Sequence, residues 1–193
     1  MNMGIVTSFL VGGLLLLTML QFNNQVMQNT SQTTLDVNSK KHMETVRKII
    51  THDINRIGFG ENNKINAFNP PHFINFKANI YGSGTKTVKW QFKENKKVKD
   101  TANPDDRVLM RVGPVSKSNG NKPTRYNVVD FSITGYSDIY GNTETTDKDQ
   151  IKSLLIKIVY EAPESMSKDD NYPRTVWQKH IVPNNLQFDQ PQN

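Results

Sequence analysis

Histidine, cysteine, serine and acidic residues most often perform catalysis or bind metals, and this 193-residue sequence uses them sparingly. It contains four histidines and no cysteine, which excludes thiol nucleophiles and Cys-ligated zinc or iron–sulfur sites. The four histidines are His42, His52, His72 and His180, and they form no H-x-x-x-H or H-E-x-x-H pattern. Without such a pattern, we expect them on a solvated helix face. A G-x-S-x-G elbow and a glycine-rich phosphate loop are also absent from the sequence. We therefore expect no catalytic residue, no cofactor and no enzymatic activity.

An acidic segment in the second half of the sequence offers oxygen ligands to a calcium ion. Asp138, Asn142 and Glu144 lie close together, and further acidic residues follow them. Calcium prefers carboxylate and amide oxygens, but the spacing misses the EF-hand pattern, which needs a bidentate glutamate at loop position 12. The three residues are calcium candidates, and a solvated hairpin loop without a metal is the alternative.

A basic run could bind an acidic partner. Lys93, Lys96, Lys97 and Lys99 follow each other closely, in a chain with a formal net charge of +6. We expect this run to lie in a loop between strands, where charged residues are usually solvated. Phosphate binding also requires stacking aromatic residues nearby, and the alternation of Trp90 and Phe92 places both rings toward the core. Nucleic acid is therefore not an expected partner.

The N-terminal region carries an apolar run, Ile5–Phe22, within a stretch that has no charged residue before Asp36. Eighteen residues at about 1.5 Å each give roughly 27 Å of helix, close to the hydrocarbon thickness of a bilayer. A buried core helix rarely lacks a charge on every face. The sequence therefore predicts a single-pass membrane anchor. Four consecutive leucines lie in its middle: Leu14, Leu15, Leu16 and Leu17.

A cleaved secretory signal is the alternative to a permanent anchor. Such a signal needs a basic residue before the apolar run and small residues at a cleavage site after it. The sequence begins Met-Asn-Met-Gly and continues after the run with Gln, Phe and Asn residues, so an uncleaved anchor fits better. The first basic pair, Lys40 and Lys41, lies at the limit where positive charge biases topology. We expect the short N-terminal tail inside and the domain on the extracytoplasmic side.

The residues after the anchor divide into a polar stem and a domain. Residues 1–22 form the predicted anchor, residues 23–43 a polar stem expected to be helical, and residues 44–193 an amphipathic helix followed by a sheet domain. Apolar residues recur at helical spacing from Met43 to Ile57, and Gly58 and Gly60 are expected to cap the end. The charged residues of this segment are expected on the other faces: Glu44, Arg47, Lys48, Asp53 and Arg56. The simplest prediction is one helix over Met3–Ile57.

The period of the pattern changes from helical to alternating after Gly60. Turn residues such as Asn69-Pro70-Pro71 and Gly82-Ser83-Gly84 separate the alternating segments. Roughly six strands with one solvated face predict an antiparallel sheet, whose apolar face the amphipathic helix would cover. The fold class is therefore α+β, with a long N-terminal helix packed on an antiparallel sheet. The expected strands lie near 74–80, 88–92, 107–112, 129–133, 154–160 and 175–182.

Three short segments resemble the type IV pilin-like superfamily, in particular its minor pilins and type II secretion minor pseudopilins of the J and W type. Residues 53–60 (DINRIGFG) look like the D-x-R-x-A-G-Y-G helix end of those proteins. Residues 131–142 (FSITGYSDIYGN) are similar to their F-x-Y-Y-D-x-x-G-N hairpin, and residues 181–186 (IVPNNL) to their V-x-P-R-N-L. The segments occur in the family's order over nearly the whole chain.

The resemblance implies a non-enzymatic structural subunit that packs against other subunits through its N-terminal helix and its sheet domain. One departure concerns the leader, because prepilins carry a basic leader and a G-F-T-L-x-E peptidase site. Here Gly4 is followed by Ile-Val-Thr-Ser-Phe, and Phe9 stands where the family has glutamate. A pilin-like protein that stays in the membrane is therefore expected. The alternatives are a membrane-tethered ligand-binding module and a structural protein of a membrane-containing virion.

Overall fold

The computed structural model describes residues 3–59, 64–82, 84–117, 120–165 and 172–187. The long helix α1 (Met3–Ile54) is followed by nine strands and the short helix α2 (Asn184–Gln187). This confirms the predicted α+β class. The strands are β1 (Ile65–Asn69), β2 (Phe73–Ala78), β3 (Lys86–Lys97), β4 (Arg107–Pro114), β5 (Asn121–Val128), β6 (Asp130–Tyr136), β7 (Glu144–Thr145), β8 (Ser153–Glu161) and β9 (Arg174–Ile181).

The strands form two antiparallel sheets, where the alternation of residues predicted one. The first sheet has the order β1-β2-β3-β4-β5, and the second has the order β7-β6-β8-β9. Strands β5 and β6 are separated only by Val129, whose amide donates to the carbonyl of Val159. The chain therefore passes from one sheet to the other through a single residue. Alternating residues predict that strands exist but do not determine how the strands are grouped.

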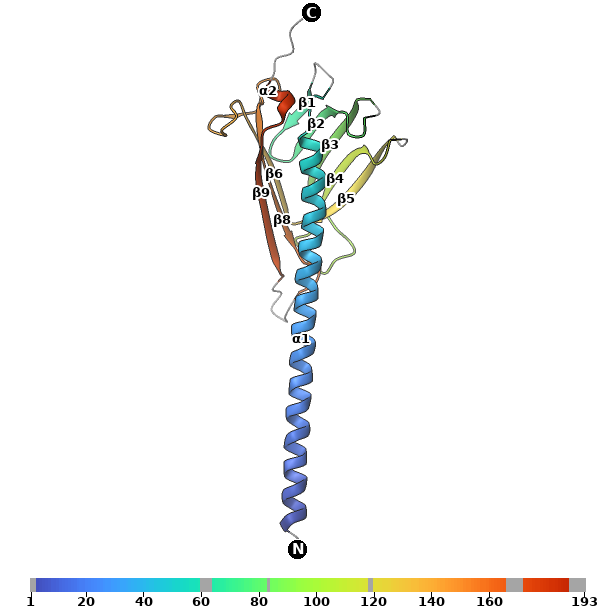
Figure 1. Cartoon of the computed structure of the whole chain (residues 1–193), viewed down its shortest axis with the longest axis vertical. Coiled ribbons are helices and arrows are strands. Elements are labelled where there is room, and N and C mark those ends of the chain that lie inside the picture. Colours follow the sequence, from blue (N-terminus) through green and yellow to red (C-terminus); the bar gives the residue numbers. More distant parts are fainter. Residues whose placement is uncertain (1–2, 60–63, 83, 118–119, 166–171, 188–193) are drawn as a thin grey trace, which may run out of the picture.

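The C-terminal half of α1 lies against both sheets, while its N-terminal half extends from the domain as a single helix (Figure 1). Val46, Ile50 and Ile54 are fully buried, as the helical spacing predicts. They share one core with residues from the first sheet, such as Trp90 and Phe76, and from the second sheet. The helix is therefore a structural part of the domain, because it supplies the centre of the hydrophobic core.

The helix ends at Ile54, three residues before the predicted end. The amides of Arg56 and Ile57 donate to carbonyls three residues back, which tightens the last turn. Gly58 then has a φ of +72°, and its amide donates to the carbonyl of Lys77 in β2 at 2.8 Å. A side chain is strained at such a φ, so glycine permits the chain to turn here from the helix onto the sheet. The predicted second cap, Gly60, lies outside the described residues.

Candidate functional site: the anchor and its junction with the domain

The first twenty residues of α1 form an apolar surface that no other part of the described chain covers. The helix is long and apolar enough to cross a membrane, and none of its most apolar window is buried within the protein. Phe9 is 83% exposed and Leu15 is 65% exposed, whereas core leucines are normally buried. The surface therefore differs from a core helix and needs an apolar environment. The four central leucines are all among its exposed residues: Leu14, Leu15, Leu16 and Leu17.

The two threonine hydroxyls within this segment are satisfied by the helix itself. The hydroxyl of Thr18 donates to the carbonyl of Leu15 at 2.8 Å, and that of Thr7 donates to the carbonyl of Met3 at 3.0 Å. An unsatisfied polar group in hydrocarbon costs several kcal/mol, about as much as a buried unpaired group in a protein. Because both hydroxyls have internal partners, neither threonine prevents the segment from lying in lipid.

The stem extends without interruption from the apolar segment to the domain. No proline occurs between the N-terminus and Pro70, and threonine hydroxyls along the stem, including those of Thr30 and Thr34, donate to carbonyls four residues back. Leu35 is half-buried, and Ser39 is 2% exposed. The free stem therefore covers residues 23–34, about 18 Å at the helical rise. The domain begins to contact the helix before the predicted boundary at residue 44.

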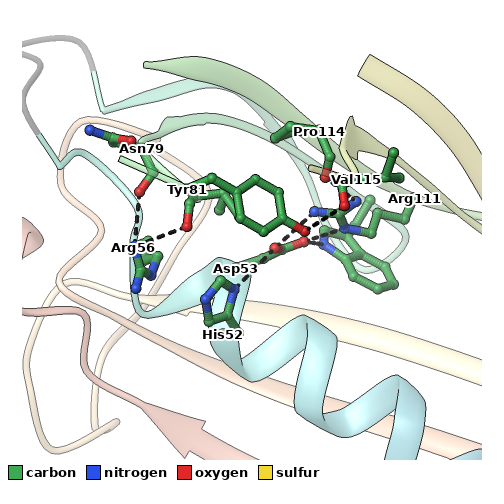
Figure 2. A network of polar contacts seen from close by, with 10 residues as sticks. His52, Asp53, Arg56, Asn79, Tyr81, Arg111, Pro114 and Val115 are labelled. Carbon is green, nitrogen blue, oxygen red and sulfur yellow. Dashed lines mark hydrogen bonds and ion pairs between the residues drawn. The ribbon is translucent and has the colours of Figure 1, made fainter. Parts of the chain in front are cut away.

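The junction between helix and domain is held by a buried ion pair. Asp53, near the end of α1, is fully buried, and Arg111 of β4 is 5% exposed. The Arg111 guanidinium donates twice to this carboxylate, from Nε to Oδ2 at 2.6 Å and from Nη2 to Oδ1 at 3.0 Å (Figure 2). Trp90 Nε1 donates to Oδ2 at 3.0 Å. Such two-point geometry fixes the angle between the groups as well as their distance.

Electrostatics favours the charged form of Arg111. Burial by itself would lower the pKa of Arg111, but the hydrogen bonds and the negative charge of Asp53 outweigh it and hold the pKa above its ordinary value. Arg111 Nη1 donates to the carbonyl of Pro114 at 3.1 Å, so all three guanidinium nitrogens have acceptors.

Burial also raises the pKa of Tyr126, which stacks on Trp90 with ring centroids 5.8 Å apart.

The helical spacing placed Asp53 on a face other than the apolar one, whereas the structure buries its side chain completely. Helical spacing identifies the faces of a helix, but it cannot show that a residue on a distant strand neutralises the charge of one of its polar side chains. Arg111 lies 58 residues further along the chain. The only sequence signal was the resemblance at residues 53–60, in which Asp53 stands at the position of the pattern's aspartate.

Arg56 fixes the same helix end to the first sheet. Its Nη1 donates to the carbonyls of Asn79 and Ile80, both at 3.0 Å (Figure 2). These residues follow β2 directly, and Tyr81 beside them donates its hydroxyl to the carbonyl of Val115 at 3.0 Å. The last turn of α1 is therefore held to both β4 and the end of β2. This arrangement determines the direction in which the apolar segment of α1 leaves the domain.

A groove of about 530 Å³ lies beside the ion pair. Lys48 and His52 of α1 form one side, and Tyr81 and Tyr126 are among the residues from the sheet. The His52 side chain is 46% exposed, and its Nδ1 lies 3.8 Å from Asp53 Oδ1. Cationic and aromatic side chains around an apolar floor are typical of small-molecule and peptide sites. The groove is therefore a candidate ligand site in the described domain.

The acidic hairpin is organised by Asp138 through backbone hydrogen bonds. Its carboxylate accepts the amides of Tyr140 at 2.7 Å and of Thr143 at 2.7 Å, and Asn142 donates its amide to both oxygens. Desolvation acts to raise the pKa of Asp138, but these amides outweigh it and lower the pKa. Among the described residues, no group of three or more His, Asp or Glu side chains is placed to hold a metal. Calcium binding at Asp138, Asn142 and Glu144 stays a prediction.

The lysine run lies mainly in a strand, where a loop was predicted. Lys93, Lys96 and Lys97 belong to the end of β3, and Lys99 follows the strand. The pairing of β3 with β4 shifts register between Lys93 and Lys97, so a bulge lies within the run. Lys96, Lys97 and Lys99 are exposed, whereas Trp90 and Phe92 are buried as the alternation predicts. Binding of an acidic partner by the run stays a prediction.

A serine and a histidine that are 27 residues apart meet in the second sheet. His180 Nε2 of β9 lies 2.8 Å from Ser153 Oγ, which is the spacing of a nucleophile and its base. However, Ser153 is fully buried, and its hydroxyl donates to the carbonyl of Asp138 at 2.6 Å. Nε2 must therefore donate to Oγ, which is the wrong direction for activating a nucleophile. The pair supports the base of the hairpin.

His42 is half-buried, whereas a solvated helix face was expected. Its Nε2 lies 3.1 Å from the carbonyl of Asn127, and its ring stacks on Tyr160 with centroids 4.5 Å apart. Burial lowers the pKa of His42, and the hydrogen bond to Asn127 only partly opposes this effect. Asp106 is buried as well, and burial raises the pKa of its carboxyl, with the charge of Glu161 adding to the effect.

His42 should make the domain less stable in mild acid. The unfolded chain takes up a proton near pH 6.5, whereas the folded chain resists it because its pKa is lower, so unfolding binds a proton below that pH. The free energy of unfolding should therefore fall as the pH drops from about 6.5 toward the folded pKa. Urea unfolding at pH 7.5 and 5.5 measures this change. The raised pKa of Asp106 changes stability with pH in the opposite direction. The contribution of His42 is therefore the difference in pH dependence between the unchanged protein and His42→Phe, which keeps a ring against Tyr160. Equal pH dependence in both proteins would contradict the assignment.

Comparison with known proteins finds no match: no protein-family model, no curated protein and no solved structure corresponds to this chain.

Proposed function

We propose that the chain is a membrane-anchored, non-enzymatic structural subunit of a pilin-like filament, secretion or surface assembly. The observation that carries the proposal is the continuity of α1. One end of this helix is an uncharged apolar surface, and the other end is part of the core of the domain. A rigid connection of this kind fixes the orientation of the domain relative to the membrane, which matters when subunits pack in an ordered array.

The proposed partners are the lipid bilayer and other subunits of the assembly. The sister subunits would contact the N-terminal helix and the sheet domain, and the domain would lie on the extracytoplasmic side. Exposed apolar residues continue from the anchor into the stem, with Val26 45%, Met27 71% and Val37 57% exposed. These residues support contacts between neighbouring stems, because such side chains gain free energy when another helix covers them.

The assembly can be tested on the intact protein from its native membranes. We expect the protein, extracted in mild detergent, to migrate in a complex larger than the monomer, and to remain there in high salt because the contacts are apolar. A protein that is monomeric at every detergent and salt condition would contradict a structural subunit. The mass of the N-terminus then identifies the assembly. A start at Ile5, with a methylated amine, would indicate prepilin-peptidase processing, and a start at Met1 would indicate an unprocessed membrane subunit.

A membrane-tethered ligand-binding module is the second candidate, and the groove beside Asp53 and Arg111 favours it. A ligand held there should stabilise the folded protein in proportion to the logarithm of its concentration. The test requires the full chain, because a fragment without α1 would lack Val46, Ile50 and Ile54 from the core. Stabilisation that Lys48→Ala reduces would favour the module, since Lys48 lines the groove.

A further inference from the structure

Three of the four sheet edges are protected against the addition of another strand. Strand β7 has only two residues, and β1 is short and shifts register between Ile65 and Ala67. Strand β5 carries Pro123, and the carbonyl of Asn127 is engaged by His42. Short strands, bulges and prolines are the usual means by which proteins block edge pairing.

The fourth edge, the outer side of β9, has none of these features in its described residues. Strand β9 has eight residues without proline, and it pairs with β8 in a continuous register. The amide of Ala162 donates to the carbonyl of Pro173, which fixes the phase of the hydrogen bonds along this register. In an antiparallel pair, successive residues direct their amide and carbonyl groups to opposite sides. The groups that point away from β8 therefore belong to Arg174, Val176, Gln178 and His180.

Side chains along β9 are exposed to solvent, and α1 lies against part of the strand. Val176 is 55% exposed, and Arg174, Gln178 and Lys179 are exposed as well. No described strand lies beyond β9 in the second sheet. A regular row of free amide and carbonyl groups next to exposed side chains is the arrangement that extended peptides use when they add to a sheet.

A second copy of the chain is a poor occupant of the edge. Strand β9 runs along the direction of α1 (Figure 1), so an antiparallel pair of β9 strands would direct the two anchors to opposite sides. This step rests on the proposed anchoring in one membrane. A parallel pair of β9 strands would place Arg174 and Lys179 beside the same residues of the second copy. Pairing of β9 with β5 of a second copy would place Lys122 and Arg125 beside these two cations. Like charges on neighbouring strands are destabilising.

We propose that the outer edge of β9 receives an extended, acidic segment of a different protein as an added antiparallel strand. The partner's backbone would pair with Arg174, Val176, Gln178 and His180. Strand β9 contains Arg174 and Lys179 and no acidic residue. Arg174 lies 3.7 Å from Glu161 of β8, but its side chain is still 57% exposed, and Lys179 is exposed as well. Glutamate or aspartate opposite those two positions is therefore favoured. Lys179 and Arg174 are five residues apart and lie on opposite faces, so the partner's acidic residues would also be five apart.

A peptide of defined sequence tests the edge on the full chain in detergent micelles. The probe is an eight-residue peptide of threonine and valine, with glutamate at its third and eighth positions. In an antiparallel register, these positions lie opposite Lys179 and Arg174. We expect amide hydrogen exchange at Val176, Gln178 and His180 to slow by at least about tenfold on binding, while Trp177 and Lys179, already paired with β8, change little. This alternation is specific to an added strand.

The controls separate backbone pairing from charge. A peptide with lysine in place of both glutamates should bind at least about tenfold more weakly. N-methylation at positions four and six removes hydrogen bonds to β9 and should abolish protection, whereas N-methylation at position five faces solvent and should not. Gln178→Pro removes one outward amide and should weaken binding, while Gln178→Ala keeps it.

Four results would overturn the proposal. These are slow exchange at the outward amides without peptide, protection that depends on protein concentration alone, protection at another edge, and no protection at millimolar peptide. Each is independent of membrane fractionation of the same chain, so failure of the edge and failure of the anchor are distinguishable.

Discussion

Leu15→Arg is expected to remove the protein from the membrane fraction. Leu15 lies near the middle of the apolar segment, where neither flank can easily bring a long basic side chain to the membrane surface. An arginine at the centre of a membrane helix costs about 2.5–3.5 kcal/mol on insertion scales, and the favourable contribution of the leucine is lost as well. Because the structure describes only one helix long and apolar enough to span, no second helix in the described chain can compensate.

The measurement is carbonate extraction followed by flotation of the membranes. Gln28→Arg is the matched control, because it introduces the same side chain into the free stem outside the apolar segment. We expect this control to remain with the membranes in the same proportion as the unchanged protein. Equal flotation of Leu15→Arg and the unchanged protein would show that the segment does not anchor the chain by spanning the bilayer.

Asp53→Ala should produce the largest loss of folding stability among single substitutions at the junction. It leaves Arg111 buried without a counter-charge and Trp90 Nε1 without its acceptor. Removing one member of a buried ion pair typically costs about 3–5 kcal/mol. For a protein of this size, that corresponds to a fall in Tm of about 6–20 °C. Thermal unfolding followed by circular dichroism measures the change in detergent.

Two further variants identify the cause of this loss. Asp53→Leu combined with Arg111→Met removes both charges, and it should be more stable than Asp53→Ala because no buried charge is left unpaired. Glu44→Ala breaks exposed ion pairs with Arg47 and Lys48 on the same helix and should change stability far less than Asp53→Ala does. A double variant as unstable as the sum of its single changes would argue against the ion pair as the cause.

The stability of the junction bears directly on the proposed role. Asp53 and Arg56 hold the last turn of α1 to the first sheet, and the same helix continues into the apolar segment. When the last turn is released, the angle between anchor and domain is no longer fixed. Asp53→Asn keeps the size of the side chain, so in a native membrane it should weaken assembly more than membrane association. Comparing complex size with membrane fractionation separates these two effects.

Several elements were predictable because their signals are local. The uncharged run through Leu14–Leu17 indicates a membrane segment by composition alone, although only fractionation can establish where it lies. Met43, Val46, Ile50 and Ile54 recur at the spacing of one helical face, and all four are buried. Trp90 and Phe92 alternate with polar residues, and both face the core. In each case, the period of the apolar residues reports the local backbone geometry.

The grouping of strands and the pairing of polar residues were decided by the tertiary structure. Asp53 meets Arg111 only because β4 lies beside the end of α1, and Ser153 meets His180 only because β8 pairs with β9. Alternation along a strand cannot identify its neighbour, so one sheet was predicted where two exist.

The sequence by itself therefore determined the apolar N-terminal segment, the buried face of the helix and the α+β class. The two sheets, the ion pair and the free edge of β9 follow from contacts between residues far apart in the chain. The physical reason is that periodicity depends on neighbouring residues along one element, whereas register and charge pairing depend on which elements pack together.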